Sequence, residues 1–93
     1  MVIMILETVP ASLRGQLTRW MIEPKAGVFI GNISAMVRQK LWDKACQGVR
    51  EGGAILIHSA KNEQGFTIDF WGKTSRWMTN WEGLQLVTRP IDP

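Results

Sequence analysis

The chain has little cysteine, no tyrosine and no long apolar run, and each shortage narrows what it can be. A single cysteine, Cys46, cannot form an internal disulfide, which excludes a small secreted scaffold held together by such bonds. The longest early apolar run covers only residues 2–6, whereas a membrane-spanning helix needs about 20 residues. This run also lacks the basic flank and small-residue cleavage site of a signal peptide. We therefore expect a soluble, cytoplasmic protein without a membrane partner.

The residue patterns of common enzyme sites are missing as well. One histidine, His58, and one cysteine are too few for a His/Cys zinc cluster. The phosphate-binding glycine loops of nucleotide enzymes and the nucleophile motif of hydrolases are also absent. His58 lies within an apolar run, so we interpret it as a packed or hydrogen-bonded residue. We interpret Cys46 as a small packed apolar residue.

What the sequence does contain is a basic charge balance and many tryptophans. Eleven Lys+Arg against eight Asp+Glu give a formal net charge of +3 over 93 residues, which permits a polyanion partner without requiring one. A chain of this length hides roughly 60–65% of its surface on folding. Such a thin core cannot easily hide five indoles, so some of them should face a partner. The five are Trp20, Trp42, Trp71, Trp77 and Trp81.

The spacing of apolar residues predicts two helices among short strands. Helices are expected over residues 10–23, ended by Pro24, and from a cap at Asn32 or Ser34 to about residue 51. The inner face of the second helix is expected to consist of Ile33, Met36, Val37, Leu41, Ala45 and Val49. Strands are expected at residues 2–6, 27–31, 54–60, 66–71 and 84–88, with a hairpin turn at 61–65.

This order predicts an α+β, ferredoxin-like fold in which two helices cover one face of an antiparallel sheet. The other face has no helix to cover it, and an exposed apolar sheet face predicts a homodimer. Between the helices this fold needs a pair of strands, of which the sequence indicates only 27–31. We expect a single domain, made of a ferredoxin-like part at residues 1–83 and a C-terminal strand and tail at 84–93.

Glu7 is the first candidate for chemistry because it directly follows an apolar strand. Ligands commonly bind at the carboxyl ends of strands in α/β layers. Two copies of Glu7 across a dimer axis could share one Mg²⁺, which binds oxygen ligands. Alternatively, the carboxylate only favours the positive end of the following helix. The residues alone leave both alternatives open.

Cations on the first helix and in the polar segment 72–83 are the candidates for binding a polyanion. Helical steps place Arg14 at the margin of the apolar face, and the neighbouring Gly15 leaves backbone that a phosphate or another chain could approach. Arg76 lies with Lys73 in a segment rich in tryptophan. We expect Arg14 and Arg76 to bind the partner. The helical cations that we interpret as solvated are Arg19, Lys44 and Arg50.

A set of spaced motifs runs through nearly the whole chain. In order, they are Glu7-Thr8-Val9-Pro10, Leu13-Arg14-Gly15-x-Leu17, Trp20, Gly27-Val28-Phe29-Ile30-Gly31-x-x-Ser34, Val37-Arg38, Leu41-Trp42, Gly65-Phe66, Gly72 and Glu82-Gly83-Leu84-x-Leu86-Val87. Together they resemble the CRISPR-associated Cas-two (Cas2) family, in the subtype found beside the Cascade complex. The combination is specific, although each fragment alone is not.

The resemblance implies a homodimer at the centre of the CRISPR adaptation complex. There it bridges dimers of the Cas-one integrase and holds double-stranded prespacer DNA for insertion into the CRISPR array, an architectural role that requires no cofactor. Arg14 matches a family position that grips the DNA backbone, and Arg76 matches one of an arginine pair. Ser12 and Ser75 stand where close relatives carry further arginines. The cations that could compensate are Lys73, Lys25 and Arg38.

The resemblance also implies an alternative function and a partner contact. The alternative is a metal-dependent endonuclease, cutting RNA or double-stranded DNA as a homodimer, with Glu7 as catalytic residue and Mg²⁺ ligand where most relatives have aspartate. The last strand of the family crosses to the partner subunit and meets the integrase. The residues expected to make this contact are Trp77, Trp81, Leu84 and Leu86.

A weaker alternative, from another class, is single-stranded RNA binding by an RRM-like sheet. Residues 64–70 faintly resemble the aromatic strand of that module. Asp69 would repel phosphate there, and Ile68 stands where the second core aromatic is expected.

Overall fold

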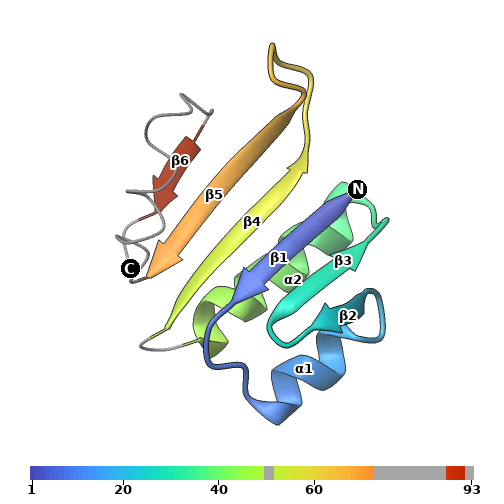
Figure 1. Cartoon of the computed structure of the whole chain (residues 1–93), viewed down its shortest axis with the longest axis vertical. Coiled ribbons are helices and arrows are strands. Elements are labelled where there is room, and N and C mark those ends of the chain that lie inside the picture. Colours follow the sequence, from blue (N-terminus) through green and yellow to red (C-terminus); the bar gives the residue numbers. More distant parts are fainter. Residues whose placement is uncertain (50–51, 73–87, 92–93) are drawn as a thin grey trace.

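The computed structural model describes residues 1–49, 52–72 and 88–91. Within these residues the chain forms six strands and two helices (Figure 1). In chain order they are β1 (Val2–Leu6), α1 (Ala11–Leu17), β2 (Ile22–Lys25), β3 (Val28–Gly31), α2 (Ala35–Gly48), β4 (Gly53–Ser59), β5 (Phe66–Gly72) and β6 (Thr88–Ile91).

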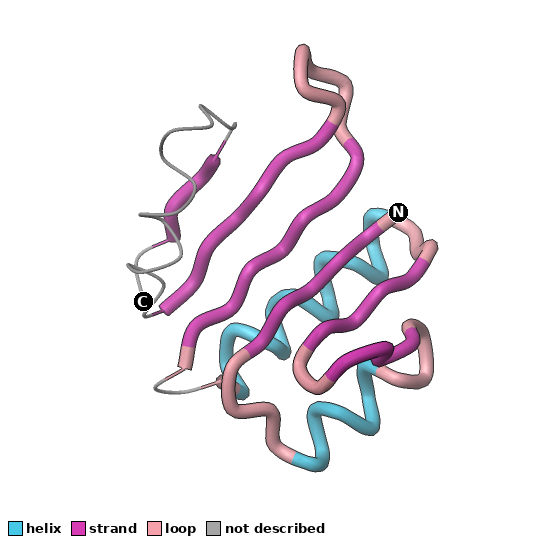
Figure 2. The backbone as a smooth tube through the Cα atoms, in the orientation of Figure 1, coloured by secondary structure: helices cyan, strands magenta, loops and turns pink. Residues whose placement is uncertain are grey.

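The described strands form one sheet with the order β2-β3-β1-β4-β5-β6 (Figure 2). Strands β1 to β5 pair antiparallel, and β6 joins the edge of β5 in parallel. Both helices pack on one face, and α2 passes behind β1 and β4 in Figure 1. The prediction of an α+β, ferredoxin-like fold is therefore confirmed. Neither described helix is long and apolar enough to cross a membrane.

The main core lies between the sheet and the two helices, around the central strand β1. Met4 of β1 pairs with Phe29 of β3 and Leu56 of β4, and all three are at most 2% exposed. Successive residues of a strand point to opposite faces, so these three define the face that carries the helices. The other buried members of this cluster are Val2, Leu6, Leu13, Leu17, Met21, Leu41, Trp42, Ala45, Val49 and Ala54.

The opposite face of the sheet is apolar across its width. Ile3 of β1 pairs with Ile30 of β3 and Ile57 of β4, and Ile57 pairs with Ile68 of β5. A second apolar cluster lies on this face, formed by Ile55, Ile68 and Phe70 with Ile5, Ile57 and Phe66 packed against them. Phe70 is only 2% exposed, so it offers no ring for stacking on an RNA base, which counts against the RRM-like alternative.

The first helix is much shorter than predicted. The helix expected over residues 10–23 is α1 alone, after which the chain turns and forms the strand β2. The Thr18 hydroxyl donates to the carbonyl oxygen four residues earlier at 2.9 Å where the helix ends. Leu13, Leu17 and Met21 are all buried. Helical spacing had grouped these three with Trp20 on one apolar face. It identified the three buried residues, but it assigned Met21 to the wrong element, and Trp20 is 55% exposed.

The strand β2 completes the pair that the fold needs between its helices, and the sequence analysis missed it. Pro24, predicted to end the first helix, lies within this strand. Because β2 is at the edge of the sheet, it has a hydrogen-bonded neighbour on one side only. An edge strand of this kind tolerates a proline, which lacks the backbone N–H. The register between β2 and β3 also shifts between Ile22 and Lys25.

The second helix agrees more closely with the prediction. The Ser34 hydroxyl caps it by accepting a hydrogen bond from the Val37 N–H at 3.2 Å, which decides between the two predicted caps. The helix ends at Gly48 rather than near residue 51. Met36 was predicted on the inner face, but it is 66% exposed, so this assignment was wrong.

His58 is hydrogen-bonded within the sheet, as predicted. Its Nδ1 lies 2.9 Å from the Ser59 carbonyl oxygen, which can only accept, so Nδ1 carries the proton. Its Nε2 lies 2.9 Å from the Thr67 hydroxyl, from which it accepts in the neutral imidazole. Both ring nitrogens are satisfied by neighbouring strand residues.

Most of the predicted C-terminal strand lies outside the described residues. The expected strand over residues 84–88 shares only Thr88 with β6, and residues 84–87 lie outside the described part of the chain. β6 pairs with β5 of its own chain. The expected crossing to a partner subunit concerns a second copy and stays a prediction.

Gly27 and Gly65 give a matched test of how closely the β2–β3 turn packs on β1. Their φ values are 82° and 84°. A Cβ on Gly27 would lie 2.5 Å from the Leu6 carbonyl oxygen, whereas a Cβ on Gly65 would have nothing within 4 Å. We expect Gly65→Ala to lower the free energy of unfolding by about 1 kcal/mol and Gly27→Ala by about 3 kcal/mol. Urea denaturation measures both losses, and equal losses would contradict the close packing.

Candidate nucleic-acid interface

Glu7 lies at the end of the sheet where the chain leaves β1. The Leu6 N–H donates to the Gly27 carbonyl oxygen at 2.8 Å, and the Glu7 N–H donates to the Gly53 carbonyl oxygen at 3.0 Å. Glu7 is half-buried. The next residue, Thr8, has a φ of 59°, which a β-branched residue rarely adopts. Glu7 is thus fixed at the carboxyl end of β1, between the β2–β3 turn and the start of β4.

The described residues of one chain do not build a metal site around Glu7. They contain no group of three or more His, Cys, Asp or Glu side chains that could hold a metal ion. Mg²⁺ takes octahedral coordination by oxygen ligands, and a single carboxylate is a weak anchor for it. A Mg²⁺ site therefore needs a second copy of Glu7 and stays a prediction.

Arg14 is held in place by an ion pair that the sequence analysis did not foresee. Its Nε lies 3.0 Å from Oε1 and 3.2 Å from Oε2 of Glu23. Glu23 belongs to β2, so the pair joins the first helix to the edge of the sheet. The Arg14 side chain is 42% exposed and that of Glu23 only 16%. The guanidinium is therefore at the surface while its carboxylate partner is largely covered.

The Glu23 carboxylate has a second donor on the adjoining turn. The Gly27 N–H donates to Oε2 at 2.9 Å. This bond is the largest cause that holds the pKa of Glu23 below its usual 4.5, and burial acts in the opposite direction. The hydrogen bond and charge of Arg14 lower the pKa further. Glu23 is therefore ionised at neutral pH, and it bridges Arg14 and the β2–β3 turn.

The other predicted DNA-binding residues are dispersed. Lys25 is exposed on β2, two positions from Glu23, so it shares a corner of the fold with Arg14. Arg38 is half-buried on α2. Lys73 and Arg76 lie outside the described residues. The same holds for the predicted partner residues Trp77, Trp81, Leu84 and Leu86.

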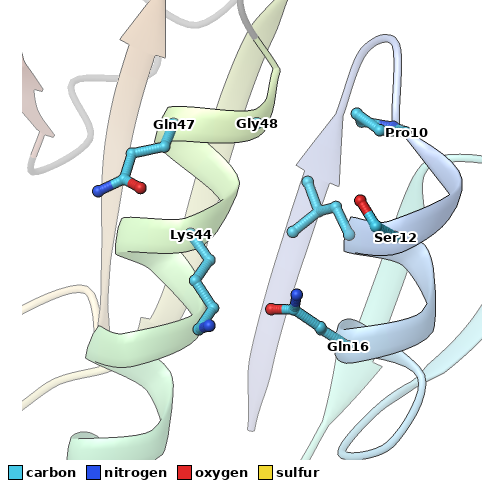
Figure 3. Close-up of a pocket in the computed structure, with 7 residues that line it drawn as sticks. Pro10, Ser12, Gln16, Lys44, Gln47 and Gly48 are labelled. Carbon is cyan, nitrogen blue, oxygen red and sulfur yellow. The ribbon is translucent and has the colours of Figure 1, made fainter.

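A groove between the two helices brings together polar residues that sequence analysis had not connected. In Figure 3 the side chains of Gln16 on α1 and Lys44 on α2 extend toward each other. The groove continues past Arg19 to Trp20, which is 55% exposed. The residues lining this groove are Pro10, Ser12, Leu13, Gln16, Arg19, Trp20, Leu41, Lys44, Gln47 and Gly48. Arg19 and Lys44, interpreted above as solvated residues of separate helices, thus line one surface.

The groove could have been predicted from a glycine in the sequence, Gly48, near the end of α2. A Cβ on Gly48 would lie 2.9 Å from Cδ2 of Leu13. The absence of a side chain lets α1 and α2 approach closely at that point.

The cations of the two helices are Arg14, Arg38, Lys40 and Lys44, against the single acidic residue Asp43. The two helices therefore carry a net positive charge.

Cys46 is a packed residue, as predicted. Like Trp71, it is partly buried and packs against the core cluster that contains Trp42. Burial raises the pKa of its thiol to about 12, and the charges of Asp43 and Asp69 add to the effect. A thiol that stays protonated at neutral pH is a poor nucleophile and a poor metal ligand.

Comparison with known families gives a match over most of the chain. A family model described as CRISPR-associated protein (Cas_Cas2CT1978) matches residues 1–86. The matched region contains both helices and the five antiparallel strands, and with them Glu7, Arg14 and Glu23.

The lowered pKa of Glu23 predicts a specific acid sensitivity of the fold. A carboxyl whose pKa is lower in the folded than in the unfolded chain adds stability above the unfolded value, near 4.5, and loses it as the pH falls through the folded value. We expect Glu23→Gln to lose less stability than the natural chain between neutral pH and about pH 3. Urea denaturation across this range measures the difference. The charge-matched control is Glu63→Gln in the exposed β4–β5 turn, and equal acid sensitivity of Glu23→Gln and the natural chain would contradict the prediction.

Proposed function

The chain belongs to the CRISPR-associated Cas2 family of CRISPR defence, and from this premise we propose that it is the architectural subunit of the spacer-adaptation complex. In this role a homodimer binds the backbone of double-stranded prespacer DNA and bridges dimers of the Cas-one integrase, which supplies the catalysis. The observation that carries the DNA-binding part is the geometry of Arg14. Its guanidinium is at the surface, and among the described residues all of its hydrogen bonds pass through Nε.

The basic helix layer supports contact with phosphates rather than with bases. Phosphate contacts position a protein on a duplex and carry no sequence information. Four helical cations against one acidic residue give the two helices a positive net charge, which attracts phosphates whatever the base sequence. A subunit that must accept foreign DNA of any sequence needs this kind of binding.

The apolar face of the sheet supports the homodimer. Ile3, Ile30 and Ile57 lie side by side on three neighbouring strands and are half-buried in the single chain. Ile22, which pairs with Ile30 at the sheet edge, is 67% exposed. A second copy joined through this face would cover these side chains. The dimer would carry twice the net charge of +3 per chain and two related copies of Arg14, matching the pseudo-twofold symmetry of a duplex backbone.

One observation favours the alternative, a Mg²⁺-dependent endonuclease that uses Glu7. Thr8, beside Glu7, has a positive φ, and backbone strain of this kind clusters at functional sites. This alternative requires cleavage of RNA or double-stranded DNA that a chelator abolishes.

Replacing Arg14 by alanine should weaken binding to a short double-stranded DNA of mixed sequence. Losing one phosphate contact per copy is expected to reduce the slope of log affinity against log salt by about 1 per copy. Fluorescence anisotropy at several salt concentrations measures both quantities. The control is Lys61→Ala, which removes the same charge from the β4–β5 turn, at the opposite end of the molecule from α1 (Figure 1).

Two results would contradict this scaffold role. An unchanged affinity and salt slope in Arg14→Ala would remove the proposed DNA contact. Chelator-sensitive cleavage that disappears in Glu7→Ala, with spacer acquisition lost while the complex still assembles, would favour the endonuclease instead.

Replacing Ile3 by aspartate should give a folded monomer. The side chain is half-buried in the single chain, and a charge there would be buried without a partner in the dimer. Sedimentation velocity measures the oligomeric state, and circular dichroism checks the fold. Met36→Asp, on the helix layer at 66% exposure, is the control that should stay dimeric. A folded Ile3→Asp variant that remains a dimer would rule out this face as the interface.

A further inference from the structure

We propose that Glu23 is a positioning residue for Arg14, holding its guanidinium by Nε so that the two terminal nitrogens are presented to a phosphate of bound DNA. This inference rests on the proposed function, because it concerns how Arg14 makes its phosphate contact. Nε lies 3.0 and 3.2 Å from the two carboxylate oxygens. Among the described residues, the terminal nitrogens have no such bond, so the outer edge of the guanidinium is left for a ligand.

Glu23 can position another side chain because it is itself fixed. Its Oε2 accepts the Gly27 N–H at 2.9 Å, and its side chain is 16% exposed. Gly27 in turn accepts the Leu6 N–H at 2.8 Å. A continuous series of hydrogen bonds therefore runs from the end of β1 through the β2–β3 turn to the Arg14 guanidinium.

A free arginine at this site would be poorly ordered. It would project from a helix of only seven residues, and ordering a long side chain on binding costs affinity. The ion pair orders the side chain before DNA arrives. Arginine suits this arrangement because its planar group has donors on two edges, whereas a lysine has a single ammonium.

A competing role for Glu23 has the opposite sign. If the carboxylate simply neutralised Arg14, its removal would raise the local positive charge and tighten DNA binding. If it positions Arg14, its removal should weaken binding, but only while Arg14 is present. The direction of the change and its dependence on Arg14 therefore separate the two roles.

The test is a double-mutant cycle measured as affinity for a short double-stranded DNA of mixed sequence. The variants are Glu23→Gln, Arg14→Ala and the combination of both. Glutamine keeps an oxygen that can accept the Gly27 N–H, so the turn should be retained, and thermal unfolding of each variant checks this. Glu63→Gln, alone and with Arg14→Ala, is the control for the unit change in net charge.

We expect Glu23→Gln to bind DNA roughly threefold more weakly than Glu63→Gln for each Arg14 engaged. In the Arg14→Ala background the two glutamine variants should bind equally, or Glu23→Gln slightly tighter. The Arg14 Nε–H resonance in the free protein should also exchange faster with water in Glu23→Gln. This measurement reports on the side chain without DNA.

Three results would overturn the inference, and each has a distinct meaning. Equal or tighter binding by Glu23→Gln with Arg14 present would assign the carboxylate a neutralising role. The same loss of binding in both backgrounds would reduce Glu23 to a structural support of the turn. If Arg14→Ala itself binds DNA as the natural chain does, the proposed Arg14 contact fails, and the positioning role fails with it.

Discussion

The close approach of Gly27 to the end of β1 is the contact on which the candidate site depends. Gly27 has no room for a side chain against the Leu6 carbonyl oxygen, and its own carbonyl accepts the Leu6 N–H. This fixes the β2–β3 turn against the central strand. Glu23 binds the N–H of the same glycine and extends the fixed region to Arg14 on the first helix. An interaction deep in the fold thus determines how a surface cation is presented.

The sequence allowed the overall fold to be predicted because most elements bury a regular apolar face. Residues 2–6 were assigned to a strand correctly because a continuous apolar run is typical of a strand buried on both faces. Residues 66–71 were assigned correctly because apolar and polar residues alternate along them. The edge strand β2 has one neighbouring strand and little apolar content, and its Pro24 is typical of a helix end as well as of a sheet edge. The helical spacing of apolar residues continued through Met21, so the start of β2 was assigned to the predicted helix and the strand was not recognised. Such an edge strand is defined by its partner in the sheet, which a local pattern does not reveal.

The candidate site was only partly predictable for a related reason. Arg14 could be selected from its place at the margin of an apolar helix face. Its partner Glu23 could not, because the helix expected through that position would have placed the two residues on one continuous element. The groove between the helices was not predicted because Arg19 and Lys44 were assigned to separate helices. The packing of the two helices on each other, which includes Gly48 on Leu13, brings these residues to one surface.

The two sides of the sheet suit different contacts of a DNA-binding dimer. The face without helices is apolar and suits a permanent contact with a second copy, while the helix layer carries the cations. Arg14 differs from Lys40 and Lys44 of that layer and from Lys25 on β2, because its charge is balanced at close range by Glu23. At distances well beyond the 3.0 Å between Nε and Oε1 the pair acts as nearly neutral, whereas the charge of a lysine without such a partner acts out to the screening length of about 8 Å at physiological salt. Attraction of DNA from a distance is therefore left to the lysines, and Arg14 contributes at contact, where the orientation of its donors matters more than its net charge.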